Sequence, residues 1–190
     1  MKNALVITLA ACFAATGAAQ TRGGRERFTA FAVNLDASAG ARTGAGVVEI
    51  VVQRWSSDAE RDRLFTALAE KGPDKLLDTL QKLPRAGYIR TPNSIGYDLF
   101  YARNNVQPDG SRHIVLATNR RVAFKEAQNN TRSMQYQLTA IEIHLDKDGK
   151  GEGKMQPAAK ISWDAKAKKI ELENYNALPI DLVNVKSKTP

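Results

Sequence analysis

The chain has 190 residues, which is enough for one domain of ordinary size with a sizeable hydrophobic core. It carries 28 Lys and Arg against 20 Asp and Glu, a formal net charge of +8 at pH 7. The only cysteine, Cys12, lies in an apolar N-terminal stretch. Disulfides, thiolate catalysis and cysteine-ligated metals are therefore excluded from the rest of the chain.

The N-terminus has the pattern of a bacterial secretory signal. A short positive start leads into the apolar stretch Ala4–Ala15, and small residues precede Gln20. We therefore predict a signal peptide over 1–19 and an exported protein, periplasmic or secreted. Because Leu9–Cys12 also matches a lipobox, anchoring as a lipoprotein at Cys12 is the alternative. The apolar run is too short and alanine-rich for a permanent transmembrane span, and no later segment is a candidate.

Two segments before residue 56 alternate between apolar and polar residues, which is the pattern of half-buried strands. They are Arg27–Leu35 and Gly46–Arg54. The stretch 37–46 between them is small and glycine-rich, so we predict a hairpin that leads into the next element.

The segment Ser56–Leu83 is the only one with convincing helical features. Ser57 and Glu60 have the spacing of a capping box, and Gly72-Pro73 divides the segment into two short helices. Leucines recur along one side of each helix. Helices of this length need tertiary burial, so core packing is the ordinary explanation of these leucines. The alternative is a lid over a barrel end or a sheet face.

After Pro84 the period-two pattern returns and continues almost to the C-terminus. The expected strands are centred on Gly87–Thr91, Tyr97–Tyr101, Arg112–Thr118, Met134–Leu145, Ala159–Trp163, Ile170–Glu173 and Ile180–Lys186. About nine strands joined by tight turns predict an α+β, mostly β fold. We expect an antiparallel curled sheet or barrel with a two-helix insert after the second strand, in a single domain over 20–190.

The chain has two histidines, His113 and His144, each in an expected strand. If those strands are neighbours, the two imidazoles and Glu142 can meet, which would support a zinc site or proton transfer and hence a hydrolase of unidentified type. Neither histidine has a second ligand at a local metal-binding spacing. The sequence therefore predicts no catalytic residue, no metal ligand and no cofactor.

The charged segment Asp146–Glu152 superficially resembles a calcium loop. Lys150 stands where the third alternating acid would be needed, and Pro157 occupies the place of the closing glutamate. We therefore expect a solvated hairpin turn over Asp146–Lys154.

The stretch Tyr88–Asp98 mixes aromatic residues, one arginine and turn formers more densely than stability requires. A structured loop between two strands is the plain explanation, and a ligand site between this loop and the helical insert is the alternative. The residues proposed for such a site are Tyr88, Arg90, Asn93, Tyr97 and Tyr101.

Three stretches together resemble a family of small exported proteins of unknown function from soil bacteria. They are Trp55–Arg61, Gly87–Ser94, and Ile141–Ile143 with the Asp-Gly-Lys-Gly-Glu-Gly-Lys turn that follows. The resemblance covers most of the mature chain. It implies export and a shared fold, and it brings no activity or catalytic residue with it.

These observations favour an exported, non-enzymatic β-rich protein that binds a small apolar or amphipathic ligand. The alternative is an envelope-associated module that binds anionic surfaces or polymers. Cleavage before Gln20 removes Lys2 and leaves 27 basic and 20 acidic residues, a net charge of +7, with basic residues concentrated in Arg103–Arg132 and Lys147–Lys169. Nucleic acid is not an expected partner, because the aromatic residues are not interleaved with the basic ones. Oligomeric state, ligand identity and strand order stay open.

Overall fold

The computed structural model describes residues 24–35, 44–92, 94–119, 138–164, 169–174 and 178–188. The expected signal peptide lies outside these residues. The described strands are β1 Glu26–Asn34, β2 Gly44–Val52, β3 Gly87–Arg90, β4 Tyr97–Leu99, β5 Tyr101–Val106, β6 Arg112–Thr118, β7 Leu138–Leu145, β8 Lys150–Asp164, β9 Lys169–Asn174 and β10 Ile180–Lys188. The two helices are α1 Asp58–Lys71 and α2 Pro73–Gln81.

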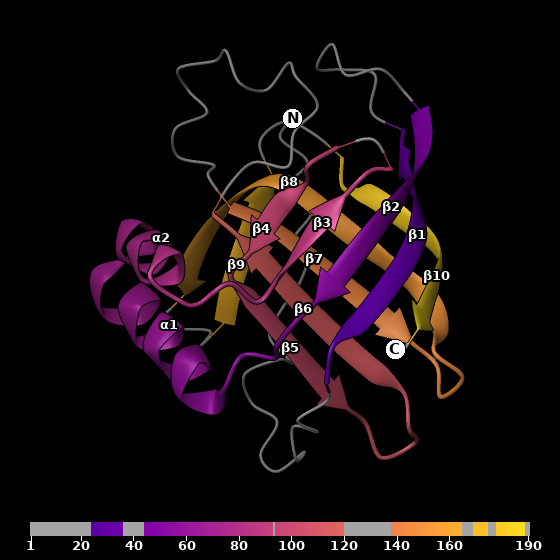
Figure 1. The fold of residues 1–190 in the computed structure, drawn as a ribbon. Helices are drawn as coiled ribbons and strands as arrows, with labels where there is room; N and C mark the ends of the chain where they lie inside the picture. The colour runs from indigo at the N-terminus through magenta and orange to yellow at the C-terminus, as the bar shows by residue number, and fades with distance from the viewer. Residues whose placement is uncertain are drawn as a thin grey trace.

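All ten strands belong to one antiparallel sheet that curls into a nearly closed barrel (Figure 1). The strand order is β4-β3-β2-β1-β10-β8-β7-β6-β5, and β9 pairs with the far end of β8. The expected mostly β fold with two helices after the second strand is therefore confirmed.

The two ends of the sheet are consecutive in the chain, which is why the barrel almost closes. β4 pairs with β3 and β5 pairs with β6, and the change of partner occurs at Phe100, whose amide donates to the carbonyl of Ala117. Ser56 adds a second link, because its amide donates to the carbonyl of Ala102 while its hydroxyl accepts from the Ala102 amide. The single strand expected over Tyr97–Tyr101 is thus two strands, since one segment must serve both edges.

The barrel interior is lined by every second residue of the strands, as period-two alternation requires. Its largest fully buried side chains include Phe28, Ile50, Leu99, Ile114 and Leu116, and Trp55 and Tyr97 pack against this core from its margin. The described interior positions are therefore occupied by packed apolar side chains.

One end of the barrel is closed by a polar network rather than by apolar side chains. The guanidinium of Arg112 donates two hydrogen bonds to the carboxylate of Glu26, at 2.6 and 2.7 Å, and a third to Asn104 Oδ1 at 3.1 Å. The Ser187 hydroxyl donates to the same carboxylate at 2.5 Å. Glu26 comes from β1 and Arg112 from β6, so this network joins opposite walls of the barrel.

The helices cover the outside of the barrel wall (Figure 1). A second core lies between the helices and outward residues of β5, β7 and β8. The helices and the turn after α2 contribute Leu64, Leu68, Leu76, Leu80 and Leu83. The strands contribute Tyr101, Leu138, Ala159 and Ile161. The rings of Phe65 and Trp163 meet edge to face at 4.9 Å. The leucines thus serve core packing, and the helices cover the face of the sheet instead of a barrel end.

The sequence predicts a turn over Asp146–Lys154. The second half of this prediction is wrong, because strand β8 already begins at Lys150. The tight turn is confined to Asp146–Gly149, where Asp146 Oδ1 accepts from the amides of Asp148 and Lys150. Gly151 and Gly153 lie within β8, where a Cβ atom would overlap carbonyl oxygens of β7. Glycine here permits close strand approach and does not form a turn.

Candidate functional site

Three polar side chains from two neighbouring strands meet on the outer wall of the barrel, over β6 and β7. Glu142 and His144 are two residues apart in β7, so they point to the same face. His113 of β6 lies directly opposite His144 in the antiparallel register. The inward neighbours, Ile114 and Ile143, belong to the barrel core, which turns all three polar side chains outward.

The three side chains converge on one carboxylate oxygen. His113 Nε2 lies 2.5 Å and His144 Nε2 lies 3.2 Å from Glu142 Oε1. The two imidazole rings are stacked, with 4.4 Å between centroids and 9° between planes. The side chains of His113 and Glu142 are 14% and 23% exposed, whereas that of His144 is 61% exposed, so the cluster opens to solvent on the His144 side.

The hydrogen bond with His113 lowers the pKa of Glu142 from its ordinary value. Burial opposes this shift, and the two imidazoles add to it when protonated. Glu142 is therefore an ionised carboxylate at neutral pH, which is the form that binds metal ions.

These groups have the chemistry of a transition-metal site. One ligand atom from each residue lies within 4.8 Å of the other two. A tetrahedral zinc ion with bonds of about 2.0–2.1 Å holds its ligand atoms roughly 3.3 Å apart. The distance from His144 to Glu142 is already close to that value, and the hydrogen bond from His113 would have to open by about 0.8 Å to admit the ion.

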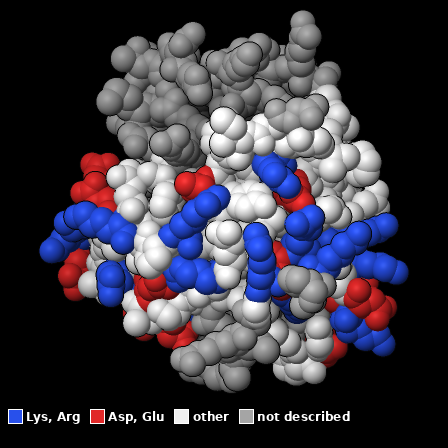
Figure 2. All heavy atoms as spheres, in the orientation of Figure 1, with Lys and Arg blue, Asp and Glu red and all other residues white. Residues whose placement is uncertain are grey.

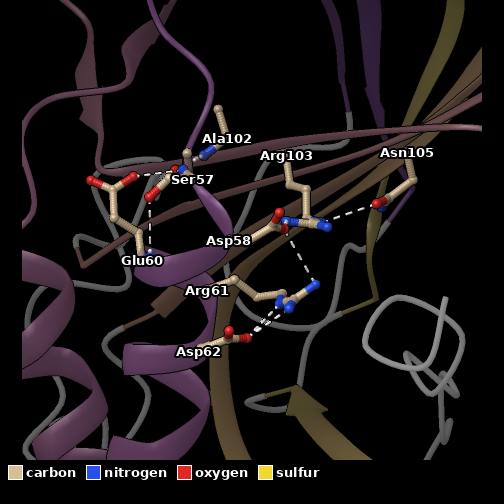
Figure 3. A network of polar contacts seen from close by, with 9 residues as sticks. Ser57, Asp58, Glu60, Arg61, Asp62, Ala102, Arg103 and Asn105 are labelled. Carbon is tan, nitrogen blue, oxygen red and sulfur yellow. Dashed lines mark hydrogen bonds and ion pairs between the residues drawn. The ribbon is translucent and has the colours of Figure 1, made fainter. Parts of the chain in front are cut away.

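A polar network joins β5, the strand next to the cluster, to the start of α1 (Figure 3). Asn105 lies opposite His113 in the register of β5 and β6, and its Oδ1 accepts from Arg103 Nε at 3.0 Å. Arg103 is buried and also donates to Asp58 at 2.8 Å, a contact that lowers the pKa of Asp58. The Asn105 Nδ2 donor is buried and has no hydrogen-bond partner among the described residues.

The start of α1 is itself held in place by the capping box expected from the sequence. The amide of Glu60 donates to Ser57 Oγ, and the Glu60 carboxylate accepts from the Ser57 amide at 2.8 Å (Figure 3). Arg61 pairs with both Asp58 and Asp62. This local order fixes the carboxylate that orients Arg103.

The residues expected to bind a ligand between the loop and the helices do not converge on one place. Tyr88 and Arg90 point outward from β3, where Arg90 pairs with Glu49 and lies over the Tyr88 ring. Tyr97 packs against the barrel interior, whereas Tyr101 belongs to the core beneath the helices. Asn93 lies outside the described residues. Binding by these residues stays a prediction.

A second polar feature is a groove of about 410 Å³ between α1 and α2. It is lined by Arg63, Thr66, Ala67, Glu70, Lys71, Lys75, Thr79 and Lys82. The sequence had indicated two other basic regions, and this one was missed because its cations come from two helices. Figure 2 shows Lys and Arg side chains spread across one face, from the helices to β1–β3, with acidic side chains among them.

Comparison with models of protein families, with curated proteins and with solved structures finds no match. None of the helices in the described part of the chain is long and apolar enough to cross a membrane. The function must therefore be argued from the two polar features themselves.

Proposed function

We propose that this protein is an exported binding protein for a divalent transition metal ion of the zinc type, held by His113, Glu142 and His144. The observation that carries the proposal is the convergence of three ligand atoms from two adjacent strands within 4.8 Å. Two imidazoles and one carboxylate suit Zn²⁺ better than Mg²⁺ or Ca²⁺, which prefer oxygen ligands. Export rests on the N-terminal signal pattern.

The position of the cluster on rigid strands favours metal binding. His113 and His144 face each other across paired strands whose inward residues are fully buried, so the backbone spacing of the ligands is set by the sheet. Only side-chain rotation is needed to admit the ion. His144 has the most room to rotate, since its side chain is the most exposed of the three.

The test is calorimetric titration of the untagged, metal-free protein with Zn²⁺ near neutral pH. His113 and His144 are the only histidines of the chain, so no other imidazole can bind the ion. We expect Glu142→Gln and His144→Asn each to weaken binding by roughly 100-fold or more, beyond what loss of an outer-shell partner costs. The matched control is Glu152→Gln, an exposed carboxylate opposite His144 in β8.

Two results would overturn this proposal. One is wild-type binding in both ligand variants. The other is a control that loses as much affinity as they do, because binding would then follow surface charge. Unchanged thermal unfolding of the metal-free variants would show that they remain folded.

A second candidate function is metal-assisted hydrolysis, which the number of ligands favours. Three protein ligands leave a coordination position for water, as in catalytic zinc sites. The zinc-loaded protein would then release p-nitrophenol from p-nitrophenyl acetate faster than the metal-free protein. Zinc-loaded Glu152→Gln should keep this activity, whereas Glu142→Gln should lose it. Equal rates with and without zinc would reject hydrolysis and leave metal binding intact.

The prediction of a small apolar ligand stays open. The described interior of the barrel gives it no support, because the inward positions are filled by packed side chains. An apolar ligand in that space would have to displace part of the core.

A further inference from the structure

We infer that the groove between α1 and α2 is a binding site for a linear polyanion, independent of the metal cluster. The groove residues Arg63, Thr66, Ala67, Glu70 and Lys71 recur at three- and four-residue spacings on one face of α1. Lys75, Thr79 and Lys82 do the same along α2 and the residue that caps it. Each helix therefore contributes one wall.

The groove is separate from the faces that hold the helices on the barrel. Leu64 and Leu68 of α1, and Leu76 and Leu80 of α2, are buried against the sheet. Of the described residues that line the groove, Ala67 alone is apolar, and its small side chain lets the helices approach closely. The packing of the insert is thus complete without the polar residues of the groove.

The charge of the groove is strongly unbalanced. Four cations, Arg63, Lys71, Lys75 and Lys82, accompany a single acid, Glu70. Within the described part of the chain none of these four cations forms an ion pair. Seven other arginines do form one with a carboxylate, namely Arg27, Arg54, Arg61, Arg85, Arg90, Arg103 and Arg112.

The spacing of the cations favours an extended ligand over a single small anion. Eight residues separate Arg63 from Lys71, which corresponds to roughly 12 Å along a helix. Lys71 and Lys75 flank the turn at Gly72-Pro73, while Arg63 and Lys82 lie toward the other end. Two cationic pairs at the two ends of one groove suit a chain of repeated negative groups.

A membrane surface fits the groove less well. Among the described residues, the lining includes no large exposed apolar side chain. The large apolar residues that are exposed lie elsewhere: Phe31, Leu35, Val47, Ile95 and Leu178. A concave lining with four cations and one acid favours a chain of negative groups that enters the groove.

The experiment measures binding of long-chain inorganic polyphosphate to the full protein at about 50 and about 200 mM salt. We expect Lys75→Gln/Lys82→Gln to weaken binding about 10- to 30-fold at the lower salt concentration. The dependence of log K on log salt should become shallower by roughly 1.5, since each lost phosphate contact removes about 0.7–0.9. Both lysines are exposed, so folding should be retained.

The matched control is Lys150→Gln/Lys186→Gln. These two exposed lysines are paired across β8 and β10, away from the helices, and their replacement removes the same formal charge. We expect at most about a two-fold change from this control, because net charge alone acts weakly once salt screens it.

Three outcomes would overturn the inference. Equal weakening in the two double variants would show that binding follows net charge. Binding to phosphatidylglycerol vesicles without binding to polyphosphate would identify the surface as a membrane contact. No binding to polyphosphate at either salt concentration would exclude the site, whatever the result of the zinc titration.

Discussion

The strongest test of the fold is removal of Arg112, which joins opposite walls of the barrel at one end. The Arg112→Met variant removes two charge-assisted hydrogen bonds to Glu26 and one to Asn104. The side chains of Glu26 and Arg112 are only 8% and 19% exposed, so the carboxylate of Glu26 is left nearly without solvent.

Loss of one partner from a buried ion pair costs about 3–5 kcal/mol, mainly because the other charge stays buried. The Ser187 hydroxyl still donates to Glu26, and the wild-type Arg112 side chain is partly exposed, which indicates that water can reach this site. We therefore expect a loss near the lower limit, about 3 kcal/mol. For a domain of this size that loss corresponds to a fall of roughly 6–12 °C in the melting temperature.

The assay is urea unfolding near neutral pH, followed by tryptophan fluorescence. Two comparisons make it decisive. The double variant Glu26→Leu/Arg112→Met should recover most of the stability, because no uncompensated charge remains. Arg85→Met removes an ion pair to Asp98 whose side chains are 46% and 54% exposed, and it should cost less than about 1 kcal/mol.

The reasoning would be refuted if Arg112→Met cost no more than Arg85→Met. It would equally be refuted if the double variant were no more stable than Arg112→Met alone. Either result would mean that the carboxylate is solvated and that the network does not close the barrel.

Three further predictions concern the backbone, the helix start and the second core. In the same urea titration, Gly151→Ala should lower the free energy of unfolding by about 1–3 kcal/mol or more, because the added Cβ would overlap a carbonyl oxygen of β7. The control Gly46→Ala should be nearly neutral, because a Cβ at Gly46 meets no atom within 4 Å. The hydrogen bond from Arg103 lowers the pKa of Asp58, so this contact stabilises the fold at pH values above the ordinary pKa of an aspartate. The unfolding midpoints of Asp58→Asn and wild type should therefore differ at pH 7 and converge as the pH falls below about 4. Leu80→Ala should cost about 2–5 kcal/mol, and a smaller loss measured by calorimetry would contradict tight docking of α2.

Much of the fold follows from local patterns in the sequence. The capping box at Ser57, the break at Gly72-Pro73 and the period-two strands are all present where the residues indicate them. Local signals were misleading at Gly151 and Gly153, which mark close strand approach instead of a turn, and at Phe100, where one segment changes partners. Neither feature has a local cause.

The candidate sites were accessible from the sequence only in part. The sequence predicts that His113, His144 and Glu142 meet if their strands are neighbours, and the register of β6 and β7 supplies that pairing. Asn105 and the buried Arg103 are not among the predicted site residues, because the segment that forms β5 is not one of the expected strands.

The sequence by itself determined the alternation, the helix boundaries and the basic charge, since each depends on neighbouring residues or on composition. The tertiary structure decided which strands are adjacent, which barrel end is polar and which cations share a groove. These are contacts between distant segments, and they exist only once the sheet curls and the helices dock on its outer wall.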